Sequence, residues 1–126
     1  MPYPTKHVSV PIGRSADAVY AYASDPANLP RWARGLVSGV VRRAGDDWIA
    51  ESPMGTIRIR FADRNPDGVL DHRVTTADGI AQLNPMRVVP NGEGAELTFT
   101  LFQAPGVTDA AFAADAAQVE ADLRRL

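Results

Sequence analysis

The sequence predicts an α+β domain in which an antiparallel sheet curves around one long helix near the C-terminus. Between Leu36 and Gln103, stretches of alternating apolar and polar residues recur between tight-turn signals, which is typical of consecutive antiparallel strands. From Asp109 to Leu126, apolar residues recur at three- and four-residue spacing, which indicates an amphipathic helix. One strand meander and one long helix bury their apolar faces together only if the sheet wraps the helix. With no linker or repeat in the pattern, we expect a single domain over residues 1–126.

The N-terminal region predicts a strand followed by two short helices. Residues Lys6 to Ile12 alternate in polarity, as expected of a half-buried strand. Ser15 is a good N-cap for a helix from Ala16 to Ala23, because its hydroxyl can accept a hydrogen bond from a free backbone N–H. Asp25-Pro26 ends that helix, and Asn28 can cap a second one.

Six further strands are expected after the helices, separated by turn signals such as Asn91-Gly92. Pro85 interrupts one of them, and because proline has no backbone N–H it indicates a bulge or an edge position. The six expected strands are Val37 to Arg43, Trp48 to Ser52, Thr56 to Asp63, Val69 to Thr76, Ile80 to Val89 and Ala95 to Gln103.

The last helix is capped by Thr108 and would be about 27 Å long if fully formed. Its apolar stripe includes Phe112 and Leu123, with only the small Ala116 and Val119 between them. A helix with such a small midsection fills the concavity of the sheet incompletely. We therefore expect a gap between helix and sheet.

Composition excludes several classes of function. A formal net charge of −2 gives no strong field for nucleic acid. The absence of cysteine excludes disulfides, and two histidines far apart in the sequence argue against a zinc site, so no metal or cofactor is expected. No apolar run is long enough to span a bilayer, and the first residues lack the apolar stretch of a signal peptide, so we expect a cytoplasmic protein.

Two stretches of the sequence carry a family resemblance. The opening VSVPIGRSADAVYAYASDPANLPRW, with Asp25-Pro26 and then Trp32, and the later NPMRVVPNGEGAELTFTLFQAPG resemble the START-like or SRPBCC superfamily. This superfamily includes polyketide cyclases and Bet v 1-type proteins. The resemblance implies a helix-grip fold: a seven-stranded antiparallel sheet curved around the C-terminal helix, with two short helices between strands 1 and 2. It also implies an elongated cavity for an apolar or aromatic small molecule, but no catalytic residue common to all members.

His72 is the leading candidate for chemistry. The alternation in its strand places Leu70, His72 and Val74 on one face. If that face is concave, the imidazole points into the cavity, opposite the small midsection of the helix, where it can act as a general acid or base. The alternative is a core histidine hydrogen-bonded to a backbone carbonyl or a polar neighbour.

Asp115 is the second candidate for a catalytic role. It lies at the border of the apolar stripe of the last helix. From there it could face His72 across the cavity and adjust the acid–base behaviour of the imidazole. The alternative is an exposed residue on the flank of an amphipathic helix.

The direction of the side chains around Pro85 is left open by the sequence. Either Met86 and Val88 or Arg87 and Val89 point inward. An inward Arg87 would bind a ligand carboxylate, and Asn84 carries the same ambiguity.

Large side chains are the expected wall of the cavity, and for Trp32 core packing is an equally good explanation. Wall and core positions are expected for Tyr22, Phe61, Met86, Phe99 and Phe112, and in a helix-grip fold the wall and the ligand site can be the same surface. The candidate ligand-binding residues are Tyr22, Trp32, Trp48, Phe61, Asn84, Met86, Arg87, Phe99 and Phe112.

Three functions fit these expectations. The first is binding of an apolar or aromatic small molecule, with polyketide cyclase- or dehydratase-like activity in which His72 moves a proton and Arg87 or Asn84 steadies an enolate-like oxygen. The second is a non-catalytic carrier or sensor with the same cavity. The third is a protein-interaction module with a collapsed cavity, for which an exposed apolar patch would indicate a partner or a homodimer.

Overall fold

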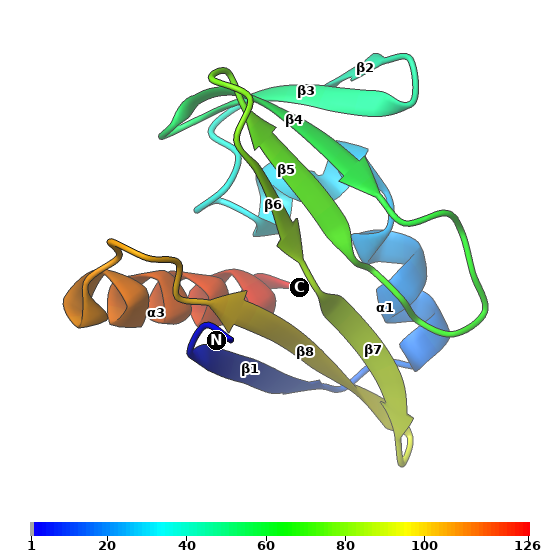
Figure 1. The fold of residues 1–126 in the computed structure, drawn as a ribbon. Coiled ribbons are helices and arrows are strands. Elements are labelled where there is room, and N and C mark those ends of the chain that lie inside the picture. Colours follow the sequence, from blue (N-terminus) through cyan, green and yellow to red (C-terminus); the bar gives the residue numbers. More distant parts are fainter. Residues whose placement is uncertain (1) are drawn as a thin grey trace.

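The computed structural model describes residues 2–126, which form two antiparallel sheets and three α-helices (Figure 1). The long helix α3 contacts strands β1 and β8 and the short helix α2. The helices are α1 (Ala16–Ala23), α2 (Leu29–Trp32) and α3 (Asp109–Arg125), with a 3₁₀ turn η1 (Pro26–Asn28) before α2. The strands are β1 (Thr5–Ile12), β2 (Arg42–Ala44), β3 (Asp47–Ser52), β4 (Gly55–Phe61), β5 (His72–Thr76), β6 (Ala81–Asn84), β7 (Met86–Asn91) and β8 (Gly94–Phe102).

The helix caps follow the sequence closely. Ser15 accepts a hydrogen bond from the N–H of Ala18 at the start of α1, and Thr108 accepts one from the N–H of Ala111 at the start of α3. Asn28, the expected cap of the second short helix, makes no capping hydrogen bond with its side chain, which instead donates to the carbonyl of Tyr22. Asp25 caps the 3₁₀ turn before that helix, and Pro26 occupies the first position of the turn. The α+β class, the long C-terminal helix and the two short helices between the first two strands are therefore confirmed, and they fit a helix-grip fold.

The single seven-stranded sheet is wrong. One sheet has three strands in the order β1-β8-β7, and the other has five in the order β2-β3-β4-β5-β6. The expected strand from Ile80 to Val89 is divided at Pro85 into β6, which pairs with β5, and β7, which pairs with β8. In Figure 1 these two strands follow one another along the chain while belonging to different sheets. Pro85 cannot donate to a ladder, and its carbonyl instead accepts the N–H of Thr100 at 3.0 Å.

Two expected strands are shorter than their apolar pattern suggested. The segment from Val37 to Arg43 contributes only its end to β2, because Val37 is buried in a loop where its N–H bonds the carbonyl of Ala33. The segment that begins at Val69 joins β5 only at His72, and Val69 makes an isolated bridge with Arg87 instead. In both places tertiary contacts override the local pattern.

The loop before β5 holds the two sheets together. The N–H of Leu70 donates to the carbonyl of Met86 at 2.8 Å, and the N–H of Val88 donates to the carbonyl of Gly68 at 3.0 Å. Gly68 has a φ of +71°, and a Cβ at this position would lie 2.1 Å from the carbonyl oxygen of Val88. Only glycine allows so close an approach of the loop to β7.

The core fills the space enclosed by the two sheets, α2 and α3. Its largest fully buried side chains come from all of these elements, so no single layer could bury its apolar face alone. They are Val10, Leu29, Ile57, Ile59, Met86, Leu97 and Leu123.

We predict that Gly68→Ala destabilises the fold more than Gly92→Ala does. Both glycines have positive φ, so each alanine variant carries a backbone cost of about 1–2 kcal/mol. Only at position 68 does the new Cβ also meet a backbone carbonyl, which adds about 1–3 kcal/mol, whereas the space around Gly92 is open. Urea denaturation of the two variants measures the difference, and equal losses would contradict the close approach.

Candidate functional site

A pocket of about 230 Å³ opens between α3 and the strands β5, β6 and β8. We call it the sheet–helix pocket. Its deep wall carries buried side chains of the sheet and of α2, and its rim carries exposed polar side chains of β6 and α3. The lining residues are Trp32, Ala33, Gly35, Leu36, Met54, His72, Val74, Gln82, Asn84, Phe99, Leu101, Asp115, Gln118, Val119, Asp122 and Leu123.

His72 lies in the deep wall of this pocket, with only 3% of its surface exposed. Its Nδ1 lies 3.0 Å from the carbonyl oxygen of Leu70, an acceptor, so Nδ1 donates the hydrogen bond. That bond leaves the lone pair on Nε2. The ring meets Phe61 edge-to-face at 5.0 Å and Phe99 at 5.9 Å, so aromatic packing fixes its position.

Burial lowers the pKa of His72 below its usual value, because the charged imidazolium would lose its hydration. The hydrogen bond to Leu70 and the nearby carboxylate of Asp71 oppose this effect but do not reverse it. His72 is therefore neutral near pH 7, with one proton held by the backbone and one basic nitrogen. This state is suited to accept a proton or a hydrogen bond.

Asp115 lines the same pocket from α3, and its side chain is exposed. Within residues 2–126, no hydrogen bond joins Asp115 to His72. The carboxylate adjacent to His72 in the chain, Asp71, turns to the opposite face of the sheet. The two candidate catalytic residues thus share a pocket without forming a hydrogen-bonded pair.

Asp122 is a buried carboxylate in the pocket wall that the sequence reasoning missed. Its Oδ2 accepts the N–H of Gly35 at 3.1 Å, and its Oδ1 accepts from Gln118 at 3.0 Å and from the guanidinium of Arg125 at 2.6 Å. The bond from Gly35 ties the segment after α2 to the end of α3, and the other two lie within α3. The available signal was an acidic residue three positions after Val119 and directly before Leu123, within the apolar stripe.

Two amide side chains and an indole complete the polar groups of the pocket. Asn84 and Gln82 reach it from β6, which settles the direction of Asn84 as inward. Trp32, 4% exposed, forms part of the wall, and its Nε1–H has no hydrogen-bond partner among the described residues. An unpartnered buried donor is uncommon in proteins and is often found at a functional site.

Arg87 does not reach the pocket, so its expected role as a carboxylate clamp is corrected. The side chain is exposed on the outer face, where Nε and Nη2 donate to the two carboxylate oxygens of Asp71 at 3.2 and 3.1 Å. The alternation of β7 then places Met86 inward, where it is 1% exposed in the core beside Phe99. The pairing holds the pKa of Asp71 below its usual value against the opposing effect of burial.

The remaining candidates are distributed between the core and a second hollow. Trp48 and Phe61 are half-buried and pack against the core, and Phe112 is half-buried on α3. In the described part of the chain, none of these three contributes to the sheet–helix pocket. Tyr22 belongs to the second hollow. Of the expected ligand-binding residues, Trp32, Asn84 and Phe99 lie together with His72.

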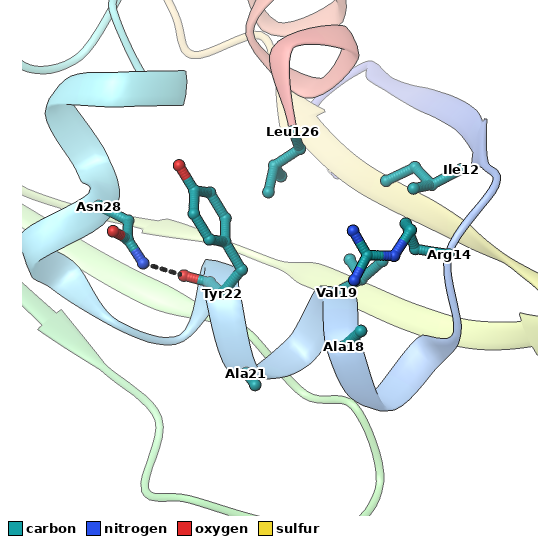
Figure 2. A pocket seen from close by; sticks show the side chains of 8 residues that line it. All are labelled: Ile12, Arg14, Ala18, Val19, Ala21, Tyr22, Asn28 and Leu126. Atoms are coloured by element: carbon teal, nitrogen blue, oxygen red, sulfur yellow. Dashed lines mark hydrogen bonds between the residues drawn. The ribbon is translucent and has the colours of Figure 1, made fainter.

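The second hollow, of about 490 Å³, lies between α1 and the C-terminal residue. Figure 2 shows Arg14 and Tyr22 facing it from opposite sides, with Leu126 between them. The side-chain amide of Asn28 donates to the backbone carbonyl of Tyr22 at 3.0 Å. Its described lining contains no buried titratable side chain, whereas the sheet–helix pocket contains two. The sheet–helix pocket is therefore the stronger candidate site.

Residues 5–126 match the family model described as polyketide cyclase / dehydrase and lipid transport, and the chain belongs to this family. None of the curated proteins matches the sequence.

Solved structures share the fold at low sequence identity. An uncharacterised protein from Bacillus thuringiensis has a TM-score of 0.76 at 17% identity, over 98% of this chain and 96% of that one. The Aha1 dimer from Colwellia psychrerythraea has a TM-score of 0.74 at 11% identity, over 96% and 91% of the two chains. DynU16, from the dynemicin biosynthetic locus, has a TM-score of 0.69 at 20% identity, over 98% of this chain and 46% of its own.

Residues 2–126 show neither a metal-binding cluster nor a membrane-spanning helix. This part of the chain holds no cluster of three or more histidine, cysteine, aspartate or glutamate side chains able to bind a metal ion. None of its helices combines the length and apolar character needed to cross a membrane.

We predict that His72 makes the fold less stable as the pH falls below about 6.5. The unfolded chain binds a proton on His72 at that pH, while the folded chain does not because burial lowers the pKa. The free energy of unfolding therefore declines by up to about 1.4 kcal/mol per pH unit, until the pH reaches the folded-state pKa. Urea titrations at several pH values measure this slope. It should disappear in His72→Asn and persist in His7→Asn, which changes a histidine on an exposed strand.

We predict that Asp122→Asn costs about 1–3 kcal/mol of stability, since one of its three donors loses its acceptor and Arg125 loses its ion pair. The control is Asp115→Asn on the same helix. Because this carboxylate is exposed, its replacement should change the free energy of unfolding by no more than about 0.5 kcal/mol. Thermal and urea unfolding measure both. Equal effects would mean that Asp122 does not tie the loop to α3.

Proposed function

We propose that the sheet–helix pocket binds a small apolar or aromatic molecule. The observation that carries this proposal is a buried, neutral histidine set among aromatic and aliphatic side chains in the wall of an open pocket. Ligand sites in proteins typically combine such apolar walls with a few convergent polar groups. Here those groups are His72 and Asn84. Membership of the polyketide cyclase / dehydrase and lipid transport family supports the same function.

The size of the pocket favours a ligand of one or two rings. An apolar cavity of about 150 Å³ accepts benzene, and drug-sized molecules occupy about 300–1,000 Å³. The value of about 230 Å³ lies between these limits. A long polyketide chain would exceed it, so we expect a compact substrate or ligand.

The chemistry that fits best is proton abstraction next to a carbonyl group, as in a polyketide cyclase- or dehydratase-like reaction. Nε2 of His72 would accept the proton from carbon, and the electron pair left behind would move onto the carbonyl oxygen. The side-chain amide of Asn84 is the donor that would steady this oxygen. Arg87 has no part in this scheme, because it is paired with Asp71 on the outer face.

A non-catalytic carrier or sensor is the second candidate, and the surroundings of His72 favour it. Nδ1 of His72 donates its hydrogen bond to the backbone carbonyl of Leu70 and not to a carboxylate, so no charged partner strengthens Nε2 as a base. Burial lowers the pKa of His72, which makes the imidazole a weaker proton acceptor. In this function His72 would instead accept a hydrogen bond from a hydroxyl or N–H of the ligand. An interaction module with a collapsed cavity is the least supported of the three functions, since the pocket is open.

Native mass spectrometry of the purified protein, followed by denaturation and identification of what is released, tests binding and reports the oligomeric state together. We expect a compact aromatic or apolar molecule in stoichiometric amount. Val74→Trp should abolish its retention by filling the pocket, while Val89→Trp on the exposed face of β7 should leave it bound. Retention by Val74→Trp would place the ligand elsewhere, for example in the hollow beside Tyr22.

Two variants of His72 separate the enzyme from the carrier once a ligand is known. His72→Asn can keep the hydrogen bond to Leu70 but has no nitrogen at the position of Nε2, whereas His72→Gln keeps a polar group near that position. For the enzyme, both variants should lose at least about 100-fold in turnover, because neither supplies a base. For the carrier, His72→Gln should bind the unchanged ligand within about tenfold of the original protein.

The pH profile adds an independent test of the catalytic mechanism. A general base works when neutral, so kcat should be flat above about pH 6.5 and fall only at lower pH, through the lowered pKa of His72. A rate that rises steeply above neutral pH would exclude His72 as the base.

A further inference from the structure

The wall of the sheet–helix pocket has a one-sided charge. It contains the carboxylates of Asp115 and Asp122, and none of its described residues is a lysine or an arginine. His72 adds no positive charge, because burial keeps its imidazole neutral. The wall of the sheet–helix pocket therefore offers no cation that could pair with the carboxylate of an acidic ligand.

The charge of Asp122 is compensated within the protein. The guanidinium of Arg125 lies 2.6 Å from its Oδ1, and the N–H of Gly35 and the amide of Gln118 donate two further hydrogen bonds to the carboxylate. A ligand entering the pocket meets a carboxylate whose hydrogen bonds are already made.

Asp115 is different, since in residues 2–126 it makes no ion pair and accepts no side-chain hydrogen bond. It is exposed and stands on the rim of the pocket. The arginine that the sequence offered as a partner for a ligand carboxylate, Arg87, is held on the far face of the sheet by Asp71. The uncompensated charge that a ligand experiences at the rim is therefore negative.

The lining residues of the pocket also differ in how deeply they are buried. His72, Trp32, Val74 and Phe99 are buried, whereas Asp115 is exposed at the rim together with the amides Gln82 and Gln118. An aromatic ring fits the deep part, and a polar substituent on that ring extends to the rim.

We propose that the sheet–helix pocket selects small aromatic molecules that are neutral or carry an amine, and rejects those that carry a carboxylate, with Asp115 as the residue that sets this preference. The inference rests on the proposed binding function and names its ligand class. An ammonium group at the rim gains an attraction to Asp115 that is weakened but not abolished by water. A carboxylate there is repelled, loses hydration, and finds no cation in compensation.

Three naphthalene derivatives with one ring system and different substituents test the proposal: 2-naphthalenemethanol, 2-naphthalenemethylamine and 2-naphthoate. Isothermal titration calorimetry at pH 7 and low salt measures the Kd of each. We expect the amine to bind about tenfold more tightly than the alcohol, and 2-naphthoate at least about tenfold more weakly. The difference between amine and alcohol should shrink in high salt, because the rim is exposed to solvent.

Asp115→Asn removes the charge while keeping the shape, so it should bring the Kd values of the amine and the alcohol within about threefold of one another and narrow the gap between 2-naphthoate and the alcohol. Glu120→Gln is the matched control, because Glu120 is an exposed acid on the same helix that lies outside the pocket lining and pairs with Arg124. It should leave the order of the three ligands unchanged.

The outcomes separate this inference from the function on which it rests. Binding of 2-naphthoate as tight as that of the alcohol would overturn the charge selection and leave the binding function standing. An unchanged preference for the amine over the alcohol in Asp115→Asn would overturn the role of Asp115. Failure of all three compounds to bind would overturn the binding function for one- and two-ring molecules, and the charge selection with it.

Discussion

The fold depends on a missing hydrogen-bond donor at Pro85. A strand that crosses from one sheet to the other must stop donating to the first ladder before it enters the second, and proline makes that interruption obligatory. On one side of it, β6 pairs with β5, and on the other, β7 pairs with β8. The bend between the two sheets creates the concave side that α3 only partly fills. Both Asn84 and Met86, the neighbours of Pro85, then point inward, the first to the pocket and the second to the core.

Much of this architecture could be predicted from the sequence, because it depends on local signals. The caps Ser15 and Thr108, the alternation in β8 and the apolar stripe of α3 each reflect a short-range rule. What could not be predicted is where non-local contacts override the pattern. Val37 is buried in a loop rather than in a strand, and Val69 forms only an isolated bridge. At Pro85 the single expected strand is divided into β6 and β7, which belong to different sheets. This division was not predictable, because the sequence alone does not show which strand each half will pair with.

The candidate site was predictable to a similar extent. The alternation around His72 correctly indicates a buried face, and the same period of two sends Asp71 to the outer face, where it meets Arg87. The role of Asp122 was not visible, because its three partners lie on α3 itself and on a segment 87 residues away in the chain. An acidic residue inside an apolar stripe is the only local trace of such a buried carboxylate. Its burial is tolerated because its oxygens are supplied with donors.

The bonds of Asp122 also bear on how a ligand enters and leaves. The hydrogen bond from the N–H of Gly35 joins the segment after α2 to the end of α3 on one side of the pocket. Opening that side would break the hydrogen bond from Gly35 to the buried carboxylate of Asp122, which makes it the slower route. The opposite side, where exposed side chains of β6 face Asp115, has no such bond among the described residues. Exchange should therefore pass between β6 and α3, so that the residence time of a ligand is set by the mobility of an edge strand and not by the packing of the core.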